Sequence, residues 1–226
     1  MITKYIRCEV PAASKAAFSK GQSLWNETAY SEGFRSQLGG WELSKGKSAN
    51  GKSTSSKAMI LAHWQDMESV KSFMKLAHDP IAEKTNQAET YSALSVSYLS
   101  AVMNIPASNQ DNQHRVESGF IRIADCYVAP DKVDAFIQEQ KTLWNPGMQQ
   151  AKGMLGGELC QFIDEANRFL VISYWQSESH HNNYTTQHFP ALKQQAATDI
   201  IETISGHNIQ TEPSWRITPL EKAIAK

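Results

Sequence analysis

The stretch YIRCEVP at residues 5–11 occurs again, with substitutions, as IADCYVAP at residues 123–130. Aligning the two stretches places Cys8 opposite Cys126. Both stretches are short, and their β-branched and aromatic content is typical of a strand. Self-similarity at this separation indicates that one folding unit occurs twice within the chain.

The two halves share a series of segments in the same order. A strand is followed by a helical pattern, two further strands, a second helical segment and a last strand. The matching segments after the first strand are the helical patterns 18–25 and 133–144, the diglycine strands 37–43 and 154–160, the tryptophan-ended strands 58–64 and 169–175, the His/Pro segments 78–81 and 188–191, and the last strands 94–103 and 209–217. This order is the split βαββαβ arrangement of a ferredoxin-like unit.

The strands also indicate how the two units pack. MILA and LVIS, within the tryptophan-ended strands, show little polar alternation, which is typical of strands that are buried on both faces. We therefore predict an α+β fold in which two fused ferredoxin-like repeats pack sheet to sheet with their helices outward. The predicted boundaries are 1–103 for the first repeat, 104–118 for a polar linker, 119–217 for the second repeat and 218–226 for a tail.

The composition is that of a globular protein. Of the 226 residues 41% are hydrophobic, and the net charge of −1 gives no reason to expect a nucleic-acid partner. The start, MITKYIRCEV, lacks the pattern of a secretory signal, and no apolar run suits a membrane span, so we expect a cytoplasmic protein without a membrane partner. Cys8, Cys126 and Cys160 lack a C-x-x-C spacing, which predicts buried thiols and not a disulfide framework or a zinc site.

The segment GKSANGKS at residues 46–53 matches the phosphate-binding pattern, with Gly46, Gly51, Lys52 and Ser53 in the fixed places. A phosphate loop needs a buried strand before it and a helix that begins at the lysine. Here the half-polar GGWEL precedes the segment, and the strand-like AMILA follows it. We interpret the segment as a hairpin loop, and nucleotide binding through Lys52 is the alternative.

His63 and Tyr174 are the candidate catalytic residues. Each stands one residue before a strand-ending tryptophan, so its side chain points to the opposite face of the strand. A His or Tyr on an apolar strand can act as a general base, or it can be a polar group satisfied at an interface. The sequence leaves both alternatives open.

Arg7 and Asp125 occupy equivalent places on the first strand of each repeat and carry opposite charges. If that face lines the interior, a structural ion pair between them is the first interpretation, and catalysis is the second. Tyr127 lies on the same face as Asp125 and is expected to join such a network.

His78 and His188 recur two residues before a proline in both repeats. The proline predicts a break in the helix, where a histidine can bond the freed carbonyls, and a place in a pocket is the alternative. His180-His181 lacks a further ligand at metal spacing, so no metal is expected. The tryptophans at equivalent positions are predicted to be core, with stacking on an aromatic ligand as a second role: Trp25, Trp144, Trp64 and Trp175.

Taken together, the paired repeats, the tryptophan-ended strands and the His/Pro breaks resemble the dimeric α+β barrel superfamily, which includes the antibiotic-biosynthesis monooxygenase-like proteins. IRCEVP, Gly33-Phe34, LGGW and the dipeptide at 63–64 look particularly like a small bacterial branch of unknown function. The resemblance implies an intramolecular dimeric α+β barrel, with one pocket per repeat between sheet and helices. It also implies that this chain fuses what is usually a second subunit, and further homo-oligomers are compatible with it.

Characterised members include cofactor-independent oxygenases of phenols, haem-degrading oxygenases, decarboxylases and dismutases. The haem-degrading branch has a Trp where this chain has Phe73 and Tyr184, and its following His is lacking here. The resemblance therefore implies a small-molecule oxygenase that needs no cofactor, with a small aromatic ligand or substrate. A non-catalytic ligand-binding or stress-related protein is the alternative.

Overall fold

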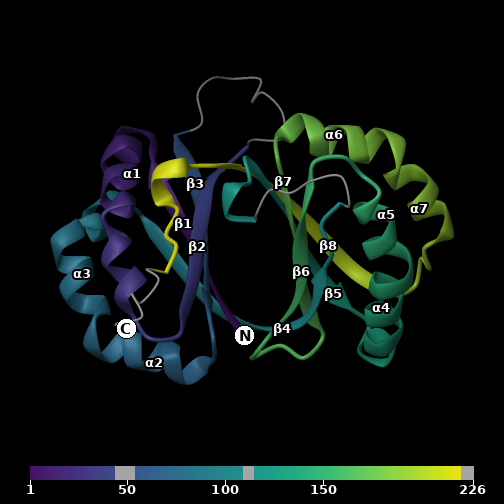
Figure 1. Ribbon diagram of the computed structural model, residues 1–226, viewed down its shortest axis with the longest axis horizontal. Coiled ribbons are helices and arrows are strands. Elements are labelled where there is room, and N and C mark those ends of the chain that lie inside the picture. Colours follow the sequence, from purple (N-terminus) through teal and green to yellow (C-terminus); the bar gives the residue numbers. More distant parts are fainter. Residues whose placement is uncertain (44–53, 109–114, 220–226) are drawn as a thin grey trace, which may run out of the picture. The chain divides into compact units, whose positions relative to one another are not determined.

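The computed structural model describes residues 1–43, 54–108 and 115–219, which form two compact units. Unit 1 contains Met1–Ser97 together with Glu212–Lys226, and unit 2 contains Tyr98–Thr211. Each unit has an antiparallel sheet and helices, which confirms the predicted α+β, ferredoxin-like character (Figure 1).

Unit 1 is built on the antiparallel order β1-β3-β2, in which β3 pairs with both neighbours. Its helices lie together on one face of this sheet (Figure 1). The elements are β1 (Ile2–Pro11), α1 (Lys15–Ser23), β2 (Phe34–Glu42), β3 (Ser55–Trp64), α2 (Met67–Leu76) and α3 (His78–Thr85). All residues of 58–64 are buried, which confirms that this strand is buried on both faces.

Unit 2 has the strand order β4-β6-β7-β5-β8, again with antiparallel pairs. The elements are β4 (Ala93–Ile105), β5 (Phe120–Val128), α4 (Val133–Glu139), α5 (Asn145–Gln149), β6 (Met154–Phe162), β7 (Arg168–Trp175), α6 (Glu178–Gln187), α7 (Phe189–Gln195) and β8 (Ile201–Thr211). A core cluster that includes Phe136, Leu159 and Phe169 joins α4 to β6 and β7.

The compact units do not coincide with the sequence repeats. From Tyr98 onward β4 belongs to unit 2, where Leu99 to Ile105 pair with β6. The last strand of the first repeat thus covers a sheet edge in unit 2, whose backbone groups would otherwise lack partners. In the other direction, the chain after Thr211 belongs to unit 1, where Ile217 bridges Gln37 and Trp215 packs on Phe18.

Two predicted elements differ from the structure. The last strand is β8, Ile201–Thr211, and not 209–217. Pro213 lacks the N–H that a strand ladder needs, and it begins a 3₁₀ turn, Pro213–Trp215, instead. The first helix of each repeat also changes geometry before or at its tryptophan, into a 3₁₀ segment Trp25–Tyr30 in unit 1 and a π-helical turn Gln140–Trp144 in unit 2.

Gly46, Gly51, Lys52 and Ser53 of the phosphate-loop pattern lie outside the described residues. Strand β3 begins at Ser55, so the nearest regular element after the pattern is a strand and not the helix that a phosphate loop requires. The chain segments 109–114 and 220–226 of the predicted linker and tail are likewise outside the description. No helix in the described part of the chain has the length and apolar run that crossing a bilayer needs.

Candidate functional site

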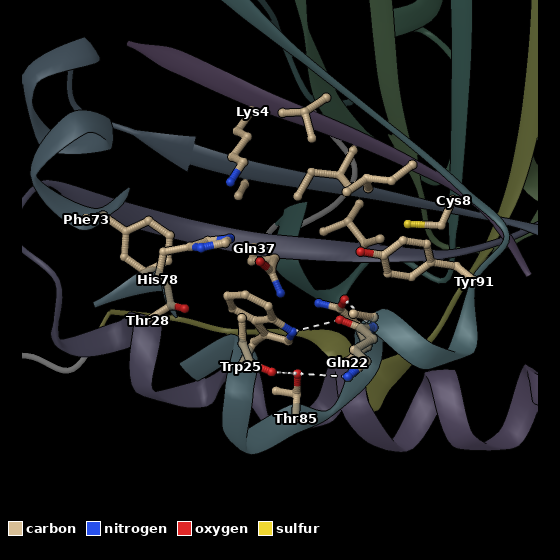
Figure 2. A pocket seen from close by; sticks show the side chains of 18 of the residues that line it. Lys4, Cys8, Gln22, Trp25, Thr28, Gln37, Phe73, His78, Thr85 and Tyr91 are labelled. Carbon is tan, nitrogen blue, oxygen red and sulfur yellow. Dashed lines mark hydrogen bonds between the residues drawn. The ribbon is translucent and has the colours of Figure 1, made fainter. Parts of the chain in front are cut away.

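A pocket of about 160 Å³ lies in unit 1 between the sheet and the helices (Figure 2). Its floor is one face of β1 and β3, because strand residues two apart point to the same side. The register sets Lys4 opposite Ala62 and Ile6 opposite Ile60, and all four residues line the pocket. The helical side adds aromatic rings, so the pocket is an apolar chamber with a few polar groups.

The rings of Trp25, Trp64, Phe73 and Tyr91 all line this chamber. Trp64 is 1% exposed and contacts Phe73 with 4.9 Å between ring centroids, so this part of the wall is fixed by packing. Trp25 follows α1 and is half-buried. Its ring is therefore available for contact with a bound molecule, as the second role predicted for it requires.

Gln87 holds Trp25 in place. Its side-chain oxygen accepts a hydrogen bond of 2.9 Å from the indole Nε1 of Trp25. Its amide nitrogen donates to Gln22 Oε1 at 3.0 Å and to the Phe18 carbonyl at 3.3 Å. Because both amide atoms are used within the protein, Gln87 is a positioning residue for the Trp25 ring (Figure 2).

His78 is the predicted site residue that the structure places in this pocket. It begins α3 directly after the break between α2 and α3, which confirms the predicted break. Its Nδ1 lies 2.8 Å from Asp79 Oδ1, and its ring contacts those of Trp25 and Phe73. If Nδ1–H donates to the carboxylate, Nε2 is left as an acceptor, which is the arrangement of a general base.

Lys4 is the buried cation of the pocket. Its side chain is among the buried polar groups, at 6% exposure for the residue, and Nζ lies 3.3 Å from the Met74 sulfur and 5.9 Å from the Phe73 ring centroid. Burial lowers the pKa of this amino group from 10.5 to about 8. Figure 2 shows the amino group directed toward the side of the pocket where Phe73 and His78 lie.

His63 and Tyr174, the predicted catalytic residues, do not line this pocket. His63 lies on the other face of β3, with Nδ1 3.1 Å from Ser36 Oγ. Tyr174 in unit 2 donates a hydrogen bond of 2.9 Å to Glu158 Oε1, and burial together with this carboxylate raises its pKa well above the usual value. Tyr174 is therefore a neutral hydroxyl donor near neutral pH.

Arg7 and Asp125 belong to different units, and each has a partner within its own unit. Asp125 is bound at both oxygens by Arg168 of the same unit, at 2.7 and 2.9 Å. The register explains this, because Tyr127 lies opposite Arg168 and strand neighbours two apart share a face. Arg7 in unit 1 instead donates to Ser95 Oγ at 3.2 Å.

Tyr127 joins the Asp125–Arg168 cluster through a hydrogen bond of 3.1 Å to Glu165 Oε2. Arg168 also bonds Glu165 and lies above the Phe162 ring at 4.1 Å from its centroid. Every charged group of this cluster thus has a partner of opposite charge. The cluster stabilises the β5–β7 pair and leaves no reactive group unpaired.

His188 stands at the corresponding break between α6 and α7 in unit 2. Its ring is stacked on Tyr184, with 6.1 Å between centroids, and Tyr184 in turn packs on Trp175. In unit 2 the residues equivalent to the aromatic wall of the unit 1 pocket, Trp175, Tyr184 and His188, therefore pack on one another.

Sequence reasoning missed Lys4, Thr28 and Gln87. A signal for Lys4 exists, since the alignment of the repeats places Arg122 at its equivalent and thus a basic residue on an apolar strand in both copies. Gln87 and Thr28 lie in short 3₁₀ segments without a pattern of their own. All three cysteines are buried thiols, as predicted, and no group of metal-ligating residues occurs within residues 1–43, 54–108 and 115–219.

Comparisons with known proteins agree with this fold and divide the chain into two halves. The family described as "Antibiotic biosynthesis monooxygenase" matches residues 119–194, and the family described as "Domain of unknown function (DUF4937)" matches residues 2–99. The uncharacterized protein YdbC of Bacillus subtilis (strain 168) is 34% identical over 87 residues, which are 38% of this chain and 67% of that protein.

Among solved structures, a candidate monooxygenase from Lactobacillus acidophilus NCFM is similar over 96% of both chains, with a TM-score of 0.70 and 11% identity. A candidate monooxygenase (FN1347) from Fusobacterium nucleatum subsp. nucleatum covers 93% of this chain and 91% of its own, with a TM-score of 0.72 and 12% identity. An anthrone oxidase-like protein covers 100% and 96%, with a TM-score of 0.65 and 12% identity. Identities this low show a shared fold and not a shared activity.

The fold and the pocket thus define a tandem ferredoxin-like α+β protein with a cavity between sheet and helices in its first unit. The chain belongs to the antibiotic biosynthesis monooxygenase-like proteins, and its first repeat falls in a branch of unknown function.

Proposed function

We propose that the protein binds a single-ring phenolic compound in the unit 1 pocket and oxidises it with O₂ without a cofactor. The observation that carries this proposal is an aromatic-walled cavity of about 160 Å³ whose lining includes His78, a histidine that pairs with the carboxylate of Asp79 outside the cavity. An apolar protein cavity of ~150 Å³ holds one benzene ring. A monocyclic compound therefore fits this cavity, whereas a polycyclic phenol or a porphyrin would require it to open.

His78 is the proposed base, supported by its position in the pocket wall beside Asp79. Removal of the phenolic proton gives an electron-rich phenolate, which is the form that reacts with O₂. Conversion of a phenol to a para-quinone consumes one O₂ and releases one water. One oxygen atom forms the new C=O bond, the other leaves with the O–H and ring C–H hydrogens, and the substrate supplies all four electrons.

We further propose the finer architecture predicted from the sequence, in which the two repeats pack sheet to sheet as an intramolecular dimeric α+β barrel. The burial of both faces of 58–64 supports it, since helices cover one face of that sheet. Small-angle scattering that requires an extended arrangement of the units would contradict this packing.

A non-catalytic ligand-binding protein is the second candidate. It is favoured by the division of the family matches, because the pocket lies within residues 2–99, where the matching family has no described function. The monooxygenase family matches the other half of the chain. The same pocket would then hold its ligand without turning it over.

Oxygen uptake with electron-rich monocyclic phenols tests the first proposal. We expect uptake by the wild type that falls by about 100-fold or more in His78→Gln, within the range that general-base catalysis contributes. His63→Gln, outside the pocket, is the matched control and should retain the uptake. A phenol that binds but causes no oxygen uptake supports the binding protein instead. If oxygen uptake is lost in His63→Gln and retained in His78→Gln, the catalytic base is His63, on the other face of β3, and not His78.

A further inference from the structure

The walls of the unit 1 pocket contain buried hydrogen-bond donors that the protein does not satisfy. Thr28 Oγ1 and Trp64 Nε1 are buried without a hydrogen-bond partner among the residues that the structure describes, and both residues line the pocket. Within the described part of the chain, Lys4 Nζ has only the Met74 sulfur, a weak acceptor, within hydrogen-bond distance. Buried donors without acceptors are rare because each costs free energy, so their gathering in one cavity indicates that a ligand supplies the acceptors.

The charge of the pocket points to the same kind of ligand. Its lining residues, all in the described part of unit 1, include Lys4 and His78 but no aspartate or glutamate. A buried ammonium group is normally paired with an anion. A neutral apolar molecule would leave the amino group of Lys4 as it is, whereas an anionic oxygen would neutralise it.

Unit 2 shows what the same positions look like when the protein itself satisfies the donors. Arg122, the equivalent of Lys4, donates to the carbonyls of Ile123 and His207. Gly206 leaves room for this guanidinium, since a Cβ there would overlap it. Arg122 therefore needs no acceptor from outside the protein.

The strand-ending tryptophans show the same contrast. Trp175 Nε1 donates to Ser173 Oγ at 2.9 Å. In unit 1 the residue two before the tryptophan is Ala62, which offers no side-chain acceptor to Trp64. The register supports the equivalence, because Lys4 lies opposite Ala62 just as Arg122 lies opposite Ser173.

From these contacts we infer that the unit 1 pocket selects a monocyclic aromatic ligand bearing an anionic oxygen, a phenolate or a carboxylate, which binds the Lys4 ammonium. Thr28 and Trp64 supply further donors for the ligand, whereas in unit 2 the residues equivalent to Lys4 and Trp64 donate to acceptors of the protein itself. This inference rests on the proposed function in one respect, that an aromatic ring occupies the pocket. It assigns Lys4 to ligand recognition and leaves proton removal to His78.

The pH dependence of binding follows from the groups that face Lys4. Burial lowers the pKa of Lys4 to about 8, so affinity for an anion should fall as the pH rises above this value. A bound anion stabilises the ammonium form and so shifts this loss of affinity to higher pH. Cys8 and Tyr91 line the same pocket, but burial raises the pKa of both thiol and phenol. His78 is the other group able to carry positive charge there, and on α2 the ammonium groups of Lys71 and Lys75 belong to exposed residues.

The test uses 4-nitrophenol, whose phenolate absorbs visible light, and 4-nitrotoluene as a neutral probe of similar size. For the wild type we expect the ratio of phenolate to phenol to be about 10- to 100-fold higher for bound than for free 4-nitrophenol at the same pH, as a charge-assisted hydrogen bond implies. In Lys4→Met the bound phenol should be protonated, while binding of 4-nitrotoluene in equilibrium dialysis is retained. Lys71→Met removes the same charge from the surface and should behave as the wild type.

Equal ionisation of bound 4-nitrophenol in the wild type and Lys4→Met would overturn the assignment of Lys4. Lys4→Gln repeats the measurement with a neutral polar side chain, in case methionine fills the cavity. If the wild type binds neither probe, the aromatic pocket of the proposed function fails. If 4-nitrotoluene binds and the phenol is not ionised, only the anion preference fails.

Discussion

At the scale of single residues, Lys4 is where stability and binding conflict. A lysine on an apolar strand face loses hydration when it is buried, which is why its pKa falls from 10.5 to about 8. Below pH 8 the folded protein must hold an ammonium group in the pocket without an anion. The empty pocket therefore contains a charge that destabilises the fold.

Lys4→Met should accordingly stabilise the ligand-free protein by up to about 3 kcal/mol at pH 7, the free energy that corresponds to the lowered pKa. Between pH 8 and 10.5 the unfolded wild type binds more protons than the folded one, so wild-type stability rises and the advantage of the variant fades. Urea unfolding from pH 7 to 10.5 measures this difference. A difference that stays constant over that range would contradict a buried charge at Lys4.

The contrast between Ala62 and Ser173 gives a reciprocal prediction. Ala62→Ser should supply Trp64 Nε1 with an acceptor and stabilise unit 1 by about 1 kcal/mol, the usual net value of such a hydrogen bond. Ser173→Ala should remove the acceptor of Trp175 and cost about 1–3 kcal/mol. Thermal unfolding of both variants tests the pair. Destabilisation by Ala62→Ser would show that the pocket side of Trp64 has no room for a hydroxyl.

At the scale of secondary structure, continuous apolar runs predict their strands, whereas polar strand segments and irregular helical turns are not predicted. The 58–64 and 169–175 strands were found because continuous apolar runs are typical of buried strands. The first part of β8, IETISGHN, is polar and partly exposed, so the sequence predicts the start of this strand too far toward the C-terminus. The 3₁₀ and π-helical turns near Trp25 and Trp144 depend on tertiary contacts, such as the Gln87 hydrogen bond, that no local pattern encodes.

Helix α6 contains a histidine that the fold keeps neutral. His181 is 5% exposed, its ring contacts those of Phe120 and Trp175, and burial is the first reason that its pKa falls to about 4. The nearby charge of Arg122 acts in the same direction. Protonation of this ring is therefore coupled to unfolding.

Between pH 6.5 and 4 the unfolded chain binds a proton at His181 that the folded chain excludes, so stability should fall by up to about 3 kcal/mol as the pH falls through this window. His181→Phe keeps the ring and removes the titration, so it should flatten this part of the stability profile. His180→Phe changes the neighbouring histidine and serves as the control. Denaturant midpoints at several pH values measure the slope, and an unchanged slope in His181→Phe would assign the loss to other groups.

At the scale of the whole chain, self-similarity predicted two copies of one unit but not the route of the chain between them. The repeats correspond by sequence, yet the end of β4 belongs to unit 2 and the chain after Thr211 returns to unit 1. Such exchange depends on which sheet edge is free, and the pattern within one repeat does not contain that information. The resemblance likewise implies a pocket, but it does not identify the buried cation. Lys4 can be assigned to the pocket only from the structure, which places β1 beneath the helices.

The returning segment provides the last prediction. Trp215 is fully buried in unit 1, where it packs on Phe18 and Trp41 and donates a hydrogen bond of 3.0 Å to Ser19 Oγ. Removal of a buried tryptophan side chain typically costs about 3–5 kcal/mol. Trp215→Ala should therefore destabilise the protein although it lies near the end of the chain.

The part of the protein that is destabilised by Trp215→Ala shows which unit residues 212–217 stabilise. These residues stabilise unit 1 if the chain returns to it after β8, and unit 2 if they pack with the repeat that precedes them in sequence. In hydrogen exchange, Trp215→Ala should lose protection first in β1 and β3 of unit 1, and much less in β5 and β7 of unit 2. Tyr30→Ala removes a large ring that is 76% exposed in the same unit and should change protection little. If protection is instead lost first in unit 2, the final segment stabilises the second repeat that precedes it in sequence, and the assignment of residues 212–217 to unit 1 is wrong.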